Sequence, residues 1–286
     1  MPELRLLACF AHPDDEAFPV GGVLAQNVEE GRRVRLITTT LGEEGDIRQE
    51  GAATKESLGE VRRIELSCAV KALRLDSNAI YEYRDSGMAG WEANNHPKAF
   101  IKAPENEVVG RLVREIREYK PQVILTFEPG GLYGHPDHIA ISKHTTTAFD
   151  LASDPKAYAD QLTNGLKPYA PQRLFYSARP KGFRLEWATK LRNAGIDFPM
   201  PSQEQIEHGN PAEEIHLELD VSHQLETKMA CIICHRTQVA PDWPYHRVPR
   251  ELAAWVLGRE FYIRARPDVA NSETVPDDFF DGIAPS

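Results

Sequence analysis

Hydrophobic and polar positions alternate in a regular order along the first half of the chain. Short apolar runs, typical of buried strands, are separated by stretches with apolar residues at helical spacing. The expected strands cover residues 4–10, 34–40, 79–83 and 123–127. The expected helices cover residues 21–31, 55–73, 105–119 and 137–152. This alternation predicts an α/β fold with a doubly wound, mostly parallel sheet, which is a Rossmann-like arrangement.

The second half of the chain contains similar elements at wider intervals. The pattern predicts strands at 173–177 and 215–219 and helices at 185–194, 224–237 and 249–257. No repeat or linker separates these elements from the first half, so we expect a single domain over residues 1–266 with a C-terminal extension. Residues 267–286 are rich in Pro, Asp and Ser, and we expect them to form a loosely ordered acidic tail.

Composition narrows the range of partners. The 286 residues include 43 acidic and 33 basic ones, which gives a formal net charge of −10. An acidic surface repels phosphate backbones, so nucleic acid is not an expected partner. No segment has the run of about 18 apolar residues that a membrane span needs, and the first residues lack the pattern of a signal peptide. We therefore expect no membrane contact and a cytoplasmic location.

The four cysteines are Cys9, Cys68, Cys231 and Cys234. In a reducing compartment we expect them to be buried thiols rather than disulfides. The segment from Cys231 to His235 has the spacing of a c-type haem attachment site or a redox pair. Both of its cysteines also fall on the apolar stripe of the predicted helix 224–237, so we favour core packing for them.

Two motifs place histidine and aspartate directly after predicted strands. Residues 11–16 read Ala-His-Pro-Asp-Asp-Glu, and residues 135–138 read His-Pro-Asp-His. In open α/β sheets, ligand sites form at the carboxyl ends of strands. Two imidazoles and one carboxylate are a common catalytic zinc set. The alternative is that each motif only forms a turn or caps a helix, and two such motifs at matching strand ends weigh against it.

Asp14 and Asp15 are adjacent, and successive side chains in an extended turn diverge. One of them can bind a metal ion while the other faces the bound water, so the pair predicts a metal ligand beside a general base.

These two motifs resemble the signature pair of the LmbE/PIG-L family of metal-dependent N-acetylglucosaminyl deacetylases, over residues 4–150. The resemblance implies that the ligands of a Zn²⁺ ion, or of Fe²⁺ in its place, are His12, Asp15 and His138. It also implies that Asp14 is the base that takes a proton from the metal-bound water. His135 would stabilise the tetrahedral intermediate or protonate the leaving amine, with Asp137 holding its imidazole.

Tyr133 matches a tyrosine that stabilises the oxyanion in similar deacetylases. The alternative is an aromatic residue that packs on the edge of the domain. A weaker similarity to a late helix of the family lies at His235 to Gln238.

Two further segments, 40–45 and 83–88, resemble the mycothiol branch of the family, whose substrate is N-acetylglucosamine linked to inositol. This resemblance implies that Arg62, Asp85 and Glu43 bind the sugar, since paired acidic and basic groups suit a polyhydroxylated ligand. Each residue also has a simpler interpretation. Arg62 can pair with Glu65 on a helix surface, Asp85 can begin a turn, and Glu43 can lie in a solvated loop.

The sequence therefore predicts a zinc-dependent hydrolase that removes the N-acetyl group from an N-acetylglucosamine-type conjugate. Its partner would be a small amino-sugar substrate, and the chain can form a homo-oligomer. The alternatives are a mycothiol-conjugate amidase or other amide metallohydrolase, and a catalytically degenerate sugar-binding module. Residues 241–266 have no counterpart that we can place in the mycothiol branch, so the sugar conjugate stays open. The histidines without a partner at ligand spacing, to which we assign no role, are His96, His144, His208, His216, His223 and His246.

Overall fold

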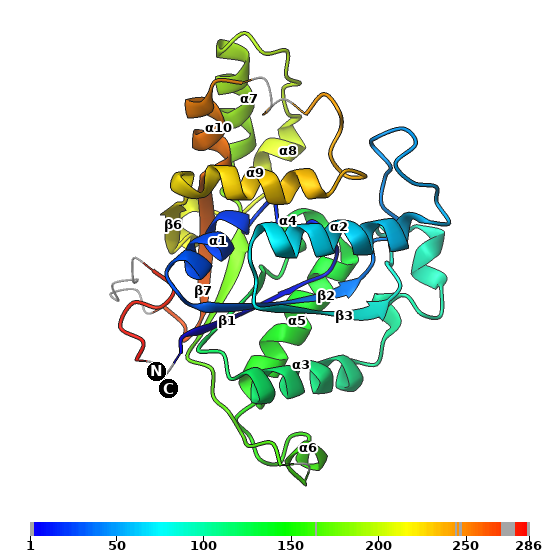
Figure 1. The fold of residues 1–286 in the computed structure, drawn as a ribbon, viewed down its shortest axis with the longest axis vertical. Helices are drawn as coiled ribbons and strands as arrows, with labels where there is room; N and C mark the ends of the chain where they lie inside the picture. The colour runs from blue at the N-terminus through cyan, green and yellow to red at the C-terminus, as the bar shows by residue number, and fades with distance from the viewer. Residues whose placement is uncertain (1–2, 164, 244, 246–247, 270–277, 285–286) are drawn as a thin grey trace.

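The computed structural model describes residues 3–163, 165–243, 245, 248–269 and 278–284. Within these residues the chain forms a seven-stranded sheet with the order β3-β2-β1-β4-β5-β7-β6 (Figure 1). The strands are β1 (Arg5–Phe10), β2 (Arg33–Thr40), β3 (Ser77–Tyr83), β4 (Val123–Phe127), β5 (Arg173–Ala178), β6 (Leu217–Asp220) and β7 (Arg259–Arg266). β1 to β5 are parallel, whereas β7 runs antiparallel to both of its neighbours. The predicted α/β fold with a mostly parallel sheet is confirmed.

Helices cover both faces of this sheet, as a doubly wound fold requires. One face carries α1 (Gly21–Glu29) and α2 (Leu58–Ala72), with α9 (Leu225–Cys234) packed on these two helices, and the other carries α3 (Glu105–Tyr119) and α5 (Pro136–Leu151) (Figure 1). The central strands are therefore buried on both sides, which explains why β1 and β4 are mostly apolar, with Arg5 and Thr126 as the exceptions. Among the described residues, no helix has both the length and the apolar character that crossing a membrane demands.

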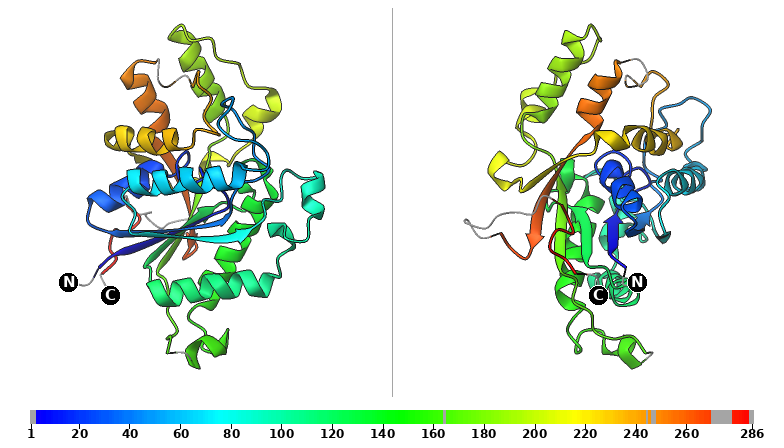
Figure 2. Two further views of the ribbon diagram at one scale, coloured as in Figure 1. Left: turned by 45° about the vertical axis from the view of Figure 1, so that its right-hand side comes forward. Right: turned by 60° about the vertical axis from the view of Figure 1, so that its left-hand side comes forward.

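The remaining helices lie around the two ends of the sheet. They are α4 (Gly131–Gly134), α6 (Ala159–Thr163), α7 (Phe183–Asn193), α8 (Gln203–Glu207), α10 (Arg250–Leu257), η1 (Glu92–Asn95), η2 (Phe100–Lys102), η3 (Ala212–Glu214) and η4 (Ser222–Gln224). The two further views show that α7, α9 and α10 gather beyond the same end of the sheet (Figure 2). Contacts of α10 with both α7 and α9 hold this group together.

The fold places a topological switch point between β1 and β4. From β1 the chain crosses to β2 on one side, whereas β4 lies on the other side and leads to β5 beyond it. Connections that leave neighbouring strands in opposite directions open a crevice at the carboxyl ends of those strands. Both histidine motifs follow these two strands, so the fold brings them to the same crevice.

The strand β7, which lies between β5 and the edge strand β6, is an element that the sequence pattern did not predict. It carries Glu260 and Arg264, which are buried although both are charged. The Glu260 carboxylate accepts from the backbone N–H groups of Gly22 and Val23 at 2.8 and 2.9 Å, and from Lys228 Nζ at 2.6 Å. It therefore satisfies free N–H groups at the start of α1 and ties the C-terminal region to the first helix.

One expectation about the cysteines is wrong. Cys68 on α2 and Cys234 at the end of α9 form a disulfide, with a Cα–Cα distance of 5.6 Å, because the two helices pack side by side. Cys9 and Cys231 are buried thiols, as expected. Of the expected tail, the described residues 278–284 include Phe279, which is buried and stacks on Phe175 with ring centroids 4.4 Å apart.

Candidate metal centre and active site

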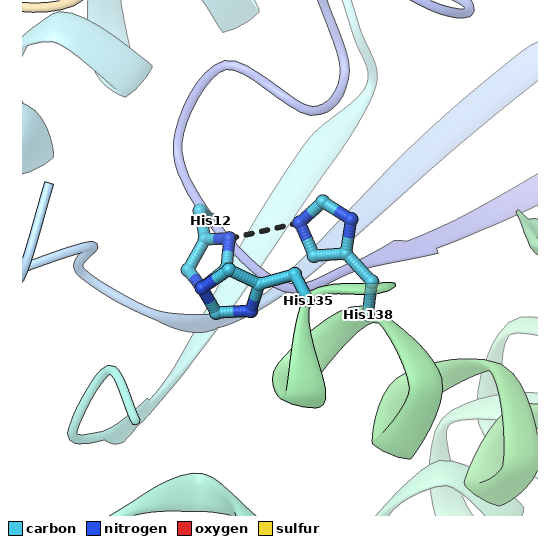
Figure 3. Close-up of side chains that lie close together, drawn as sticks. All are labelled: His12, His135 and His138. Atoms are coloured by element: carbon cyan, nitrogen blue, oxygen red, sulfur yellow. Dashed lines mark hydrogen bonds between the residues drawn. The ribbon is translucent and has the colours of Figure 1, made fainter. Parts of the chain in front are cut away.

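Three histidines from two distant loops meet where β1 and β4 end (Figure 3). His12 follows β1, and His135 and His138 lie at the start of α5. Nδ1 of His12 is 3.1 Å from Nε2 of His138. The ring centroid of His135 is 4.5 Å from that of His12 and 5.0 Å from that of His138. The structure therefore brings the two sequence motifs together at one point.

Asp15 adds a carboxylate to the facing nitrogens of His12 and His138. Its Oδ1 is 3.3 Å from Nε2 of His138, and its Oδ2 is 3.6 Å from Nδ1 of His12. Atoms that bind a tetrahedral zinc ion at its usual bond lengths lie about 3.3 Å apart. The backbone N–H groups of Ala11 and His12 donate to Oδ2 at 3.1 and 2.8 Å and so fix the carboxylate. This donor set fits a small divalent cation.

Hydrogen bonds of the other ring nitrogens support the same conclusion. Nδ1 of His138 is 3.2 Å from the carbonyl oxygen of Gly131, and Nε2 of His12 is 3.3 Å from Oδ2 of Asp137. Each of these nitrogens faces an acceptor, so each carries the proton of its neutral imidazole. The nitrogens that face each other then both present a lone pair. Two lone pairs at this separation require a cation or a proton between them.

His135 lies beside this donor set, and nitrogen atoms of the three histidines lie within 4.8 Å of one another. Its Nδ1 accepts from the backbone N–H of Asp137 at 3.2 Å, and its Nε2 is 3.9 Å from Oδ1 of Asp85. The expectation that the Asp137 side chain holds this imidazole is wrong. Asp137 is in the first turn of α5, where its N–H reaches His135 while its carboxylate turns toward His12 and the N–H of Ser86.

Asp14 points away from its neighbour Asp15, as adjacent side chains in a turn must. Its backbone φ of 114° is rare for a residue other than glycine. The strained backbone is fixed because the N–H of Asp14 donates to Oε2 of Glu16 at 3.0 Å. Oδ1 of Asp14 is 3.3 Å from Nη2 of Arg62. The carboxylate is therefore held at the mouth of the site without joining the donor set.

Arg62 is a buried residue, and it is not the surface partner of Glu65. Its guanidinium donates to the carbonyl oxygens of Pro13 and Gly42 and contacts Asp14. A Cβ at Gly42 would lie 2.0 Å from Nη1 of Arg62, so only glycine allows this approach. Glu65 instead accepts from the N–H and hydroxyl of Thr237, each at 2.7 Å.

The electrostatics of the cluster keep one positive charge at its centre. Burial alone would lower the pKa of His12, but the carboxylates of Asp85 and Asp137 outweigh it and raise this pKa well above its usual value. Burial and the neighbouring His12 charge hold the pKa of His138 well below its usual value and lower that of His135 to about 3. Burial raises the pKa of Asp15 to about 7. The protein thus stabilises a single cation among these residues, which a metal ion can supply.

The residues expected to bind substrate surround a polar chamber of about 190 Å³ next to the histidines. Arg62, Asp85 and Tyr133 line it, but Glu43 does not. Glu43 accepts from the N–H of Asp85 at 3.0 Å, so it supports a lining residue from behind. The next residue, Glu44, lines the chamber in its place. Glu43 therefore lies in the loop that lines the chamber, but its own side chain is outside the lining.

Tyr133 stands at the entrance, and 48% of its surface is exposed. It sits in the short helix α4, where Leu132 has a φ of 60° and the chain departs from helical geometry. Its ring centroid is 5.0 Å from that of His138 and 6.0 Å from that of His135. It is therefore not an aromatic residue of the domain edge, because it faces the imidazoles.

A buried pair behind the site was not predicted from the sequence. Nε2 of His235 is 2.5 Å from Oε1 of Glu16, and neither side chain is exposed. Sγ of Cys231 is 3.9 Å from the same oxygen. The two partners are 219 residues apart, so no local pattern reveals the pair. The only signal was the similarity of residues 235–238 to a late helix of the family.

A doubly wound sheet with two imidazoles and a carboxylate at its switch point defines a class of α/β hydrolases that use a bound cation. The family model described as PIG-L, GlcNAc-PI de-N-acetylase, matches residues 7–149. The chain belongs to this family, and the resemblance predicted from the two motifs is confirmed, together with the class of N-deacetylase.

Relatives match over the full length of the chain. It is 35% identical over 299 residues to a 1D-myo-inositol 2-acetamido-2-deoxy-alpha-D-glucopyranoside deacetylase of Streptomyces griseus, with coverage of 100% of this chain and 91% of the relative. It is 34% identical over 297 residues to the enzyme of the same name from Streptomyces avermitilis, with coverage of 100% and 99%.

Solved structures share the fold at lower identity. The N,N'-diacetylchitobiose deacetylase from Pyrococcus horikoshii has a TM-score of 0.63 and 19% identity, over 91% of this chain and 83% of that one. The 4-carboxy-2-hydroxymuconate hydratase from Pseudomonas putida has a TM-score of 0.61 and 16% identity, over 94% and 99%. Since one fold carries two different reactions, the reaction must be argued from the site.

Proposed function

We propose that this protein is a zinc-dependent hydrolase that removes the acetyl group from an N-acetylglucosamine unit linked to a polyol such as inositol. One observation carries the proposal: Nδ1 of His12, Nε2 of His138 and a carboxylate oxygen of Asp15 face one another at 3.1 to 3.6 Å. The curated relatives named above act, by their names, on an inositol-linked acetamido sugar. The polar chamber beside the three donors suits such a substrate.

His12, Asp15 and His138 would hold the ion. Two imidazoles and one carboxylate favour zinc, and iron(II) accepts the same ligands. When bound, the ion supplies Lewis acidity: it lowers the pKa of a coordinated water and polarises the amide carbonyl. Asp137 would orient His12, since its Oδ2 is 3.3 Å from Nε2 of that ring.

Asp14 would act as the general base that receives a proton from the attacking water. Its side chain lines the polar chamber, and its backbone and carboxylate are fixed by Glu16 and Arg62. A base held at a fixed angle loses little entropy when the substrate binds. The proton that Asp14 receives can then pass to the leaving amine.

His135 and Tyr133 would stabilise the transition state. Burial lowers the pKa of His135, so its ring is neutral near pH 7 and Nε2 can donate a hydrogen bond. Tyr133 keeps its hydroxyl proton, because burial and then the charge of Asp15 raise its pKa. Both residues line the polar chamber. They can donate to the oxyanion or the leaving nitrogen.

Asp85 and Arg62 would orient the sugar hydroxyls from opposite sides of the polar chamber. Asp85 is anchored by the N–H groups of Gly87 and Glu44 at 2.8 and 3.1 Å, so its carboxylate cannot swing away. Glu44 and Gln238 add further polar groups to the lining. A neutral polyhydroxylated ligand can satisfy all of them through paired hydrogen bonds.

The test is release of acetate from N-acetylglucosaminyl inositol by the purified protein, before and after treatment with a chelator. We expect activity that disappears with the metal and returns on addition of zinc. Asp14→Asn should keep the metal but lose turnover. Asp281→Asn, an exposed change at the far end of the sheet, should keep both. Acetate release that survives complete removal of metal would refute the proposal.

A further inference from the structure

A second and larger chamber opens from the same metal centre. It has a volume of about 570 Å³, within the range of pockets that hold drug-sized ligands. It shares Asp14, Arg48 and Tyr133 with the polar chamber. Asp15 and His138 line only the larger chamber, whereas His135 and Asp85 line only the polar one. The donor atoms for the metal therefore lie between two spaces of different character.

Aromatic side chains form a continuous wall of the larger chamber. The ring centroid of Trp243 is 6.5 Å from that of Phe18 and 4.9 Å from that of Tyr245, which in turn is 5.9 Å from that of Trp187. Val256 of α10 lies in the same lining. Most of this wall comes from the region after β5, and part of it from residues 241–266, whose place in the family pattern the sequence left open. Pro244 and His246 of that segment lie outside the described residues.

The direction of the reaction decides which part of a substrate enters this space. In an amide of an amino sugar, the sugar is on the nitrogen and the acyl group is on the carbonyl carbon. His135, the proposed donor to the leaving nitrogen, lines only the polar chamber, as does Asp85. The sugar therefore lies on that side. The carbon chain of the acyl group must then extend toward His138 and the aromatic wall.

An acetyl group fills very little of this space, since it has only a methyl group beyond the carbonyl. Charges in the lining also restrict the occupant. Lys228 is paired with Glu260 at 2.6 Å, so it is neutralised. The other charged groups of the lining are Asp14, Asp15, Arg48, Arg179, Arg184 and Arg259. The excess of arginines disfavours an acyl group with an ammonium, such as a free aminoacyl group, and the aromatic wall favours a hydrocarbon chain.

We propose that the larger chamber is an acyl-binding site, and that the enzyme cleaves glucosamine amides of medium-length fatty acyl groups better than it cleaves the acetamide. This inference rests on the proposed function, because it uses the same metal centre and the same sugar position. It extends the substrate class from N-acetyl sugars to N-acyl sugars. Each methylene that leaves water for the aromatic wall should raise kcat/KM about fourfold.

The experiment compares N-acetyl, N-butanoyl, N-hexanoyl and N-octanoyl derivatives of methyl glucosaminide with the zinc-loaded enzyme. We expect kcat/KM to rise along the series, mainly through a lower KM. Cleavage of the acetamide alone, with no rise for longer chains, would overturn the acyl site and leave the proposed function intact. Failure to cleave any member would refute the proposed function itself.

Two variants on one helix test whether the larger chamber causes the preference for long acyl chains. Val256→Phe narrows the chamber and should abolish the advantage of long chains while leaving acetamide cleavage unchanged. Leu252→Phe, one turn earlier on α10 and outside the lining, should behave as the wild type. Should Val256→Phe fail to fold, Phe18→Ala removes part of the wall from a half-exposed position, and we expect the same loss of preference.

A further comparison of substrates identifies which part of the substrate occupies the larger chamber. The octyl glycoside of N-acetylglucosamine carries its chain on the sugar instead of on the amide. We expect no rise in kcat/KM over the methyl glycoside, and no effect of Val256→Phe on that ratio. An octyl glycoside that gains activity and loses it in Val256→Phe would show that the chamber holds the aglycone, and would overturn the proposal.

Discussion

Among the described residues, two histidine–carboxylate clusters begin in the same loop at residues 12–16, and they differ in how their hydrogen bonds are satisfied. In the closed pair, Glu16 receives His235 Nε2 on one oxygen and the N–H of Asp14 on the other. In the open cluster, Nδ1 of His12 and Nε2 of His138 face each other. The closed pair has its charge balanced within the protein, whereas the open cluster requires an added cation. This difference indicates that the closed pair supports the structure and that the open cluster is the metal centre.

The closed pair and the open cluster also differ in how a ligand can reach them. Glu16 and His235 are completely buried, so no ligand can reach them. The open cluster lies between two chambers, which let a substrate approach from one side and its acyl group extend to the other. Breaking the closed pair should therefore change stability, and breaking the open cluster should change metal content and turnover.

The largest effect is expected for His138→Ala. Removal of one of three donors leaves a bound metal with too few ligands, so metal content should fall from about one equivalent to near zero and turnover should be lost. Elemental analysis and acetate release measure both. His223→Ala, which removes an exposed histidine, is the control. A His138→Ala protein that keeps a full equivalent of metal would show that the ion lies elsewhere.

Asp14→Asn should have the next largest effect. The amide keeps the size of the side chain but cannot accept a proton, and general-base catalysis contributes about 10²- to 10⁴-fold. We expect kcat to fall by that factor while metal content stays at one equivalent. Steady-state kinetics on the zinc-loaded variant provides the measurement. Full activity in this variant would exclude Asp14 as the base.

Asp137→Asn tests the support of the open cluster. The carboxylate holds Nε2 of His12 at 3.3 Å, and loss of such a partner weakens metal affinity about 10- to 100-fold. Competition with a zinc-binding dye gives the dissociation constant. The variant should still reach full metal content at high zinc, in contrast to His138→Ala. An unchanged affinity would mean that Asp137 does not orient His12.

The smallest effect on activity is expected from the closed pair. The charge of His235 overcomes the burial of Glu16 and lowers its pKa below the usual 4.5, and the charge of Glu16 overcomes burial and raises the pKa of His235 above 6.5. The carboxylate contributes stability above pH 4.5 and loses it as the pH falls through its lowered pKa. The imidazole contributes below pH 6.5 and loses it as the pH rises through its raised pKa.

The pair is therefore most stabilising between pH 4.5 and 6.5. In that window Glu16→Gln should lower the free energy of unfolding of the metal-free protein by about 1.5–3 kcal/mol. Urea unfolding of both proteins over a range of pH provides the comparison. The difference should shrink on either side of the window. A difference that is constant with pH would mean that the pair is not ionised.

The sequence pattern predicted the fold well where burial is simple. Apart from Arg5 and Thr126, β1 and β4 are apolar because helices cover both faces, so their limits could be recognised without any structure. β7 was missed because Glu260 and Arg264 interrupt its apolar positions, and only the distant partners of these residues explain their burial. The Cys68–Cys234 disulfide was missed for a related reason, since it depends on how α2 and α9 pack.

The residues of the site also divide into those that a local motif predicts and those that depend on distant contacts. His12, Asp15 and His138 could be proposed because each motif is local and follows a strand, and the topology then brings the strand ends together. The contact between Glu16 and His235 could not be predicted, since the sequence around either residue does not indicate the other. The position of Glu43 behind the chamber could not be predicted, because a one-residue shift in a loop decides which of two adjacent carboxylates lines the chamber.

The most direct test of the metal centre is anomalous diffraction at the zinc absorption edge, from crystals of the protein grown with zinc. We predict one strong peak within about 2.0–2.2 Å of Nδ1 of His12, Nε2 of His138 and an oxygen of Asp15. A peak beside Glu16, Cys231 and His235, with none at the first position, would contradict the distinction between the two clusters.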